Sequence, residues 1–215
     1  MENLKELFGA EYYNKGFHGI VRSKYGDLYH YTCYIGEHII DIDEGDSVVY
    51  ISEDLKILEW RRGSLNLHVK HYAVVLRGYT PENKTSELCL KTTLPYVNGC
   101  STRQIFPPER LGDPTLQMLI IPPYSKEQAH HIHSTPRIVY VLQGSGYSIV
   151  GMEYKYIRER LLPGQVVVID PMCPHHFETQ SERLVVIPLH IFSSIGALEN
   201  NHPMFNGTHM INQGM

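Results

Sequence analysis

Five of the 13 histidines in this chain lie in two short stretches of its second half. The first stretch contains His131 and His133, which share a face if the segment is extended, because alternate residues of a strand point the same way. His130 has the opposite parity and should face away. Two imidazoles side by side can occupy neighbouring positions around a metal ion. The doublet therefore predicts two ligands of a metal site.

The second stretch follows an apolar run at residues 166–169 and a turn rich in proline. His175 and His176 come directly after this turn. The turn thus presents one or two further histidines, which could complete a site begun by the doublet.

The first stretch resembles motif one of the cupin superfamily, H-x-H-x3-E-x6-G. His131, His133 and Gly144 match this pattern, whereas Arg137 stands where it has glutamate. The resemblance covers residues 117 to 190. It implies a small antiparallel β-barrel of jelly-roll type.

The second stretch is similar to motif two, P-G-D-V-V-V-I-P-P-G-V-P-H-A-F. Aligned without a gap, the resemblance makes His175 the third metal ligand. A register one residue later makes His176 the ligand instead. The ungapped register is preferred because it keeps the string Pro-His-x-Phe.

Arg137 in place of the motif glutamate removes a negative ligand and leaves two arrangements open. In one, Arg137 turns to a carboxylate such as Glu127 or Asp170, and a divalent ion on three histidines keeps its full charge, which favours an anionic, chelating substrate. In the other, the guanidinium repels the metal or binds a ligand carboxylate through its two-pronged donor face. Arg137 is therefore a candidate catalytic residue.

The first arrangement resembles the three-histidine cupin dioxygenases that cleave gentisate and β-diketones with ferrous iron. We therefore expect an enzyme of the non-haem iron dioxygenase type that acts on a small anionic or chelating molecule. The alternatives are a non-redox metal-dependent lyase, isomerase or cyclase, and a non-catalytic protein that binds a small ligand. Spacing does not separate Fe²⁺ from Zn²⁺, Ni²⁺, Mn²⁺ or Cu²⁺, because imidazoles bind all of them.

Short β-branched or alternating runs predict strands along most of the chain. They lie at residues 39–42, 47–51, 65–69, 73–76, 117–121, 138–142, 147–150, 166–169 and 184–187. Only residues 2–13 have the apolar spacing of a helix. The pattern predicts an all-β sandwich or barrel, in agreement with the fold that the resemblance implies.

Prolines and glycines gather at residues 95–112 and predict a boundary between two regions. We expect an N-terminal β-rich region at residues 1–104, a metal-binding cupin domain at 105–195 and a C-terminal tail at 196–215. The first region either extends the sheets of the second half or is a degenerate second cupin. By resemblance to cupins, an N-terminal β arm would suit a homodimer.

The composition of the 215 residues predicts a folded protein, with 42% hydrophobic and 20% charged side chains. A net charge of −4 argues against nucleic acid as a partner. No apolar run approaches the roughly 20 residues of a membrane span. The first residues lack the order of a secretion signal, and the four cysteines are scattered, so we expect free thiols and a cytoplasmic protein.

Overall fold

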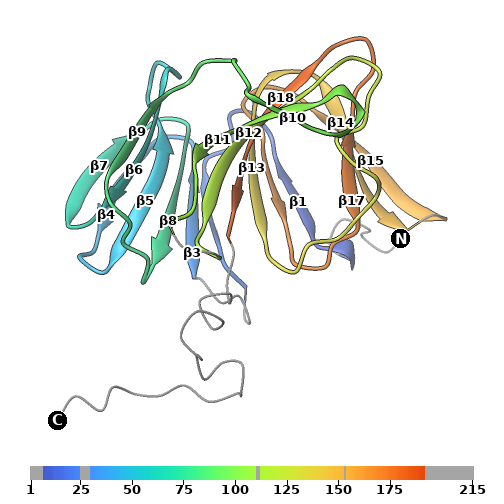
Figure 1. The fold of residues 1–215 in the computed structure, drawn as a ribbon. Helices are drawn as coiled ribbons and strands as arrows, with labels where there is room; N and C mark the ends of the chain where they lie inside the picture. The colour runs from blue at the N-terminus through green and yellow to red at the C-terminus, as the bar shows by residue number, and fades with distance from the viewer. Residues whose placement is uncertain (1–6, 25–29, 110–111, 153, 192–215) are drawn as a thin grey trace, which may run out of the picture.

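The computed structural model describes residues 7–24, 30–109, 112–152 and 154–191. These residues form antiparallel sheets almost throughout, which confirms the predicted all-β fold. The two halves of the chain form two β-rich lobes that lie side by side (Figure 1). In this part of the chain, no helix has the length and apolarity needed to cross a bilayer.

The C-terminal lobe consists of a seven-stranded and a three-stranded sheet, with strand orders β1-β16-β13-β18-β12-β11-β10 and β15-β14-β17. Its strands are β1 (Ala10–Tyr13), β10 (Leu94–Pro95), β11 (Ser101–Phe106), β12 (Thr115–Ile121), β13 (Arg137–Gly144), β14 (Gly146–Met152), β15 (Lys155–Leu161), β16 (Val166–Ile169), β17 (His175–Glu178) and β18 (Leu184–His190). A single 3₁₀ turn, η1 (Val97–Gly99), separates β10 from β11.

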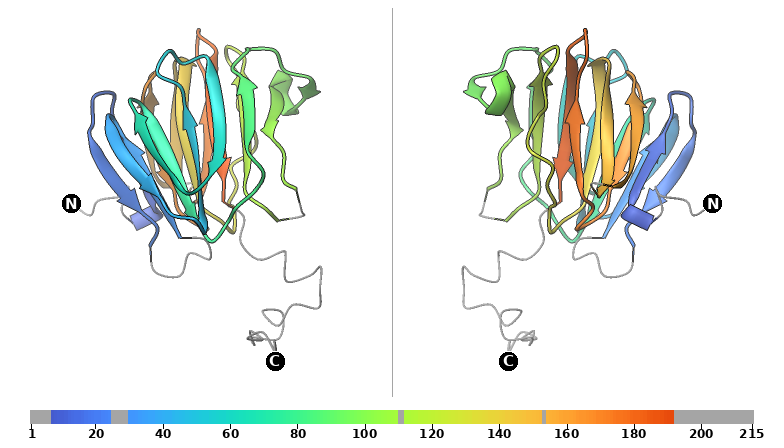
Figure 2. Two further views of the ribbon diagram at one scale, coloured as in Figure 1. Left: turned by 90° about the vertical axis from the view of Figure 1, so that its left-hand side faces the viewer. Right: turned by 90° about the vertical axis from the view of Figure 1, so that its right-hand side faces the viewer.

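The N-terminal lobe consists of a six-stranded sheet of order β2-β3-β8-β5-β6-β9 and the two-stranded sheet β4-β7. Its strands are β2 (Gly19–Arg22), β3 (Tyr31–Ile35), β4 (His38–Ile42), β5 (Asp46–Ile51), β6 (Ile57–Arg62), β7 (Leu65–Val69), β8 (Tyr72–Arg77) and β9 (Lys84–Glu87). Views from the two sides show this lobe and the C-terminal lobe in turn (Figure 2).

The two large sheets have the same order of strands. Read from β9, the N-terminal order β9-β6-β5-β8-β3-β2 corresponds to β1-β16-β13-β18-β12-β11 in the C-terminal sheet. Strand β4 corresponds to the segment before β13, and β7 corresponds to β17. This segment and β17 are joined by bridges at Lys126–Glu178 and His131–His175, as β4 and β7 are paired with each other. The N-terminal region therefore has the strand order of a second barrel, without a counterpart of the β14–β15 hairpin.

Of the helix expected at residues 2–13, the described part of the chain contains only Leu7 and Phe8, and the expectation is wrong for residues 10–13. Ala10–Tyr13 forms strand β1, which pairs with β16, while residues 1–6 lie outside the described ranges. Ala10 and Tyr12 pack against the core of the C-terminal lobe. The open edge of β16 offers hydrogen-bond partners for the backbone of residues 10–13. This pairing outweighs the helical spacing of the apolar side chains.

Alternation along the strands separates the core between the lobes from the interior of the C-terminal barrel. On β13, Ile138 and Tyr140 belong to the core between the two large sheets, where the rings of Tyr140 and Tyr72 stack with centroids 5.5 Å apart. Val139 and Val141 belong to the interior core of the C-terminal barrel. Arg137 has the parity of Val139 and therefore faces the same interior.

The four cysteines, all of which lie in described segments, form no disulfide. Cys33, Cys100 and Cys173 are buried and Cys89 is exposed. The expectation of free thiols is thus confirmed.

Candidate metal centre

Three histidines from two segments of the C-terminal barrel come together. His131 and His133 lie in the segment between β12 and β13, and His175 is the first residue of β17. The backbones of His131 and His175 exchange two hydrogen bonds, with N···O distances of 3.1 and 2.9 Å. The ligand nitrogens of the three rings all lie within 4.8 Å of one another. This local pairing holds the two segments at the distance that a shared metal ion needs.

Hydrogen bonds to the backbone orient two of these rings. His131 Nδ1 donates to the Ala129 carbonyl at 2.7 Å, and His175 Nδ1 donates to the Cys173 carbonyl at 2.8 Å. Because a carbonyl oxygen can only accept, Nδ1 carries the hydrogen in both rings and Nε2 keeps its lone pair. This is the tautomer that a metal ligand requires.

The spacing of the nitrogens fits a metal ion. His131 Nε2 and His133 Nε2 are 3.0 Å apart. Two nitrogens each about 2.1 Å from one ion, at right angles to each other, are separated by about 3.0 Å. The two rings therefore match neighbouring positions around a cation, and His175 supplies a third imidazole within reach.

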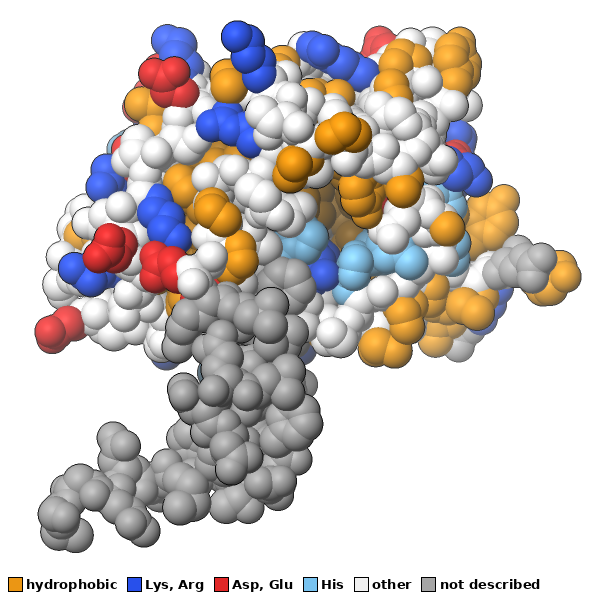
Figure 3. All heavy atoms as spheres, viewed as in Figure 1, with side chains coloured by type: hydrophobic (Ala, Val, Ile, Leu, Met, Phe, Trp, Pro, Cys, Tyr) orange, Lys and Arg blue, Asp and Glu red, His pale blue; other side chains and the backbone are white. Residues whose placement is uncertain are grey.

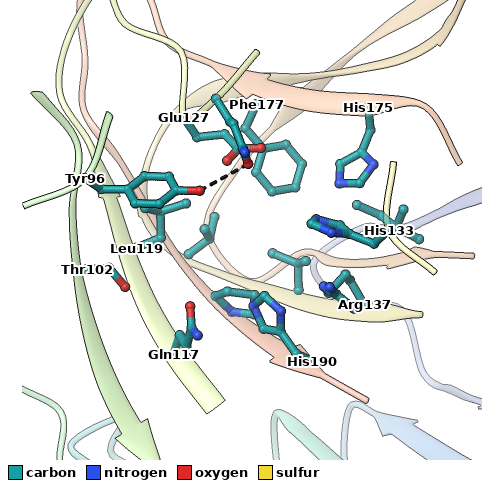
Figure 4. A pocket seen from close by; sticks show the side chains of 15 residues that line it. Tyr96, Thr102, Gln117, Leu119, Glu127, His133, Arg137, His175, Phe177 and His190 are labelled. Atoms are coloured by element: carbon teal, nitrogen blue, oxygen red, sulfur yellow. Dashed lines mark hydrogen bonds between the residues drawn. The ribbon is translucent and has the colours of Figure 1, made fainter. Parts of the chain in front are cut away.

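A cavity opens beside the three histidines. Its volume is about 110 Å³, and His133 and His175 are part of its wall. In the close-up, these two rings project into it from one side, opposite Tyr96 and Glu127 (Figure 4). In the space-filling view, histidine side chains border a hollow of the C-terminal lobe (Figure 3). A small ligand could therefore reach the nitrogens.

A family comparison supports the interpretation of both motifs. The sequence model described as the cupin domain matches residues 117–192, which span β12 to β18 and include all three histidines. The chain contains a cupin domain. A comparison with curated protein sequences gave no significant match.

Solved structures resemble the chain at low sequence identity. A Pseudomonas aeruginosa protein described as glyoxylate-induced is 11% identical with a TM-score of 0.52, covering 84% of this chain and 80% of its own. The 7S globulin of Momordica charantia is 10% identical, with a TM-score of 0.48 and coverages of 86% and 84%. The polyketide cyclase RemF of Streptomyces resistomycificus is 20% identical, with a TM-score of 0.38. The match covers 45% of this chain and 68% of that protein. The first of these likenesses extends over both lobes and shows the fold alone.

Arg137 lies in the wall of the cupin cavity, as its strand parity requires (Figure 4). Its Nη1 donates to the carbonyls of Thr135 and Pro136 at 3.0 and 3.2 Å, and also to the Thr135 hydroxyl. Asp170, one of the two carboxylates expected to receive Arg137, instead forms an ion pair with Lys24. Burial lowers the pKa of the Arg137 guanidinium to about 10, so it remains charged at neutral pH.

The three imidazoles are held in the neutral form. Burial, together with the positive charge of Arg137, lowers the pKa of His133 to about 3 and that of His175 to about 4. Burial also lowers the pKa of His131. Since only a neutral imidazole binds a metal, protons compete little for this site at neutral pH.

His176, the alternative third ligand, lies apart from this cluster. Its Nδ1 is 2.8 Å from His130 Nδ1, and His130 Nε2 donates to the Gly151 carbonyl at 2.6 Å. Adjacent residues of β17 point to opposite faces, so His175 faces the cavity and His176 faces His130. The structure brings His175, and not His176, to the motif-one doublet.

Two further residues near the metal centre, Glu127 and His190, carry side chains that can bind a ligand or transfer a proton. Glu127 is 7% exposed, and its Oε1 lies 4.0 Å from His131 Nε2. Burial raises the pKa of Glu127 to about 7. His190, which pairs with Arg137 across β13 and β18, has its ring centroid 6.4 Å from that of His133. The sequence indicates Glu127 only as a partner for Arg137, and its position four residues before His131 is the signal that relates it to the metal site.

The metal-free protein should lose stability as the pH falls from about 6.5 towards 4. In the unfolded chain these histidines take up protons near pH 6.5, whereas burial keeps them neutral in the fold, so the unfolded state binds more protons in this range. Glu127 acts in the opposite sense, because its raised pKa contributes stability that is lost as the pH rises. The three imidazoles of this site have lowered pKa values, and among the described residues only this one carboxylate has a raised value, so we expect a net loss of stability on acidification.

Urea denaturation of the metal-free protein at a series of pH values measures this dependence. The slope should flatten in a His133→Asn, His175→Asn variant, which has lost two of the depressed imidazoles. Stability that increases on acidification over the same range would contradict the assigned protonation states.

Proposed function

We propose that the cupin domain is a metal-dependent enzyme of the non-haem iron dioxygenase type, with His131, His133 and His175 as the metal ligands. The observation that carries this proposal is the convergence of three neutral imidazoles beside a cavity, with no carboxylate among the clustered ligand atoms. Ferrous iron bound there would supply redox chemistry with dioxygen, and zinc or nickel would supply Lewis-acid chemistry.

The charge of the site indicates the class of substrate. Three neutral ligands leave the full charge of a divalent cation uncompensated, and Arg137 adds a positive side chain to the same cavity. Both features favour a small anionic or chelating organic molecule. A guanidinium binds a carboxylate through paired donors, so Arg137 is the residue that we assign to orienting such a group.

Oxygen consumption by the iron-loaded protein tests the proposal. We expect a panel of β-diketones, hydroxybenzoates and hydroxy acids to contain a molecule that is consumed with stoichiometric uptake of dioxygen. The metal-free protein should be inactive. Turnover that continues under anaerobic conditions would contradict the dioxygenase assignment in favour of a lyase, isomerase or cyclase.

A further inference from the structure

Glu127 is built into the cavity wall next to the histidine cluster. Its backbone N–H donates to the Phe177 carbonyl at 3.0 Å, which attaches the segment before His131 to β17. Its carboxylate faces the cavity from the wall opposite His133 and His175 (Figure 4). The residue is therefore held in place by the same strand that presents His175.

The Glu127 carboxylate is beside the ligand atoms and outside their cluster. Its Oε1 is 4.0 Å from His131 Nε2, and the group of convergent ligand atoms contains histidines alone. Among the described residues, no lysine or arginine forms an ion pair with it. A buried carboxylate in this position has acceptor capacity directed at whatever molecule occupies the cavity.

Two other polar side chains that line the cavity, Tyr96 and Arg137, are less suited to that role. The Tyr96 hydroxyl donates to the side-chain oxygen of Gln128 at 3.1 Å, so the Gln128 oxygen already accepts a hydrogen bond. Arg137, which also lines the cavity, has only donors. The cavity thus offers a donor for a ligand carboxylate and, near His131, an acceptor for a ligand hydrogen.

We propose that Glu127 accepts a hydrogen bond from a hydroxyl of the ligand held at the histidine cluster, which makes the ligand a small hydroxy acid with adjacent carboxylate and hydroxyl oxygens. The proposal rests on the metal site proposed above. Two adjacent oxygens suit chelation, and the hydroxyl still carries a hydrogen that needs an acceptor once it leaves water. When Glu127 is ionised, such a charge-assisted hydrogen bond is about twice as strong as a neutral one.

Binding of glycolate and of methoxyacetate to the zinc-loaded protein tests this assignment. Methoxyacetate carries a methyl group in place of the hydroxyl hydrogen of glycolate, so it cannot donate a hydrogen bond from that oxygen. By calorimetry, Glu127→Gln should weaken glycolate binding at least tenfold and methoxyacetate binding less than twofold. Comparing the effect of the substitution on the two probes removes any difference in their intrinsic affinity for zinc. Glu127→Asp keeps the charge but shortens the side chain by one methylene, so it should give an intermediate loss of glycolate binding. This variant replaces the glutamine variant in the test if the latter does not fold.

Glu178→Gln is the matched control. Glu178 lies on β17, the strand to which the Glu127 backbone is bonded, but its carboxylate pairs with Arg158 at 3.0 Å and lies near His176, away from the cluster. This variant should bind both probes like the unchanged protein. Equal losses for both probes in Glu127→Gln, or no loss for either, would overturn the role of Glu127. Failure of the unchanged zinc protein to bind glycolate would overturn the hydroxy-acid class alone, whereas failure to bind zinc would overturn the metal site as well.

Discussion

Replacing His175 with alanine is expected to lower the affinity of the protein for a divalent cation by about a thousandfold. Structural zinc in zinc-finger peptides is bound with roughly 10–16 kcal/mol, so at a comparable binding strength the loss of one ligand in three removes several kcal/mol. The remaining rings, His131 and His133, would hold the ion from neighbouring positions only. Competition with a chromophoric zinc chelator measures the change.

His176→Ala is the control for this experiment. His176 is the next residue along β17, and its Nδ1 contacts His130 on the other face of the strand. Its removal should leave the affinity for the cation unchanged within about threefold, because His176 is not one of the three clustered histidines. Loss of metal from the His176 variant, with retention by the His175 variant, would show that the shifted motif register is the correct one.

Gly144→Ala should destabilise the protein by about 3–5 kcal/mol. Gly144 has a φ of +78°, and a Cβ built there would lie 1.8 Å from the Arg183 carbonyl oxygen. This backbone cannot rotate away like a flexible side chain, because Gly144 and Leu184 are register partners in the β13–β18 ladder. The substitution would therefore separate the two strands that carry Arg137 and His190.

Gly16→Ala isolates the cost of the backbone conformation from that of the collision. Gly16 has a φ of +87°, but a Cβ there would meet nothing within 4 Å. We expect a loss of about 1 kcal/mol, as for other left-handed positions with free space. Urea denaturation compares the two variants. Equal losses at both positions would contradict the close approach of Arg183 to Gly144.

The strands could be predicted from sequence because their pattern is local. The runs at residues 47–51 and 184–187, for example, lie within β5 and β18, and both are almost wholly buried. The strand at Ala10–Tyr13 could not be predicted, because it depends on pairing with β16, more than 150 residues away in the chain. The parallel between the two sheet orders also depends on long-range pairing, which short apolar runs do not specify.

The candidate site shows the same division. The spacing of His131 and His133 and the Pro-His turn identified the three rings that the structure brings together. The surroundings of Arg137 and the closeness of Glu127 depend on how the irregular segment before β13 crosses β17. Iron as the metal, dioxygenase activity, a homodimer, a cytoplasmic location and the domain limits 105–195 stay predictions.

A crystal structure of the metal-soaked protein, with diffraction recorded at the absorption edge of the metal, would show whether the three histidines bind one ion. We expect one anomalous peak among the Nε2 atoms of His131, His133 and His175, at about 2.0–2.1 Å from each. A peak at the His130–His176 pair, or none in the cupin cavity under conditions that saturate the protein with metal, would contradict it.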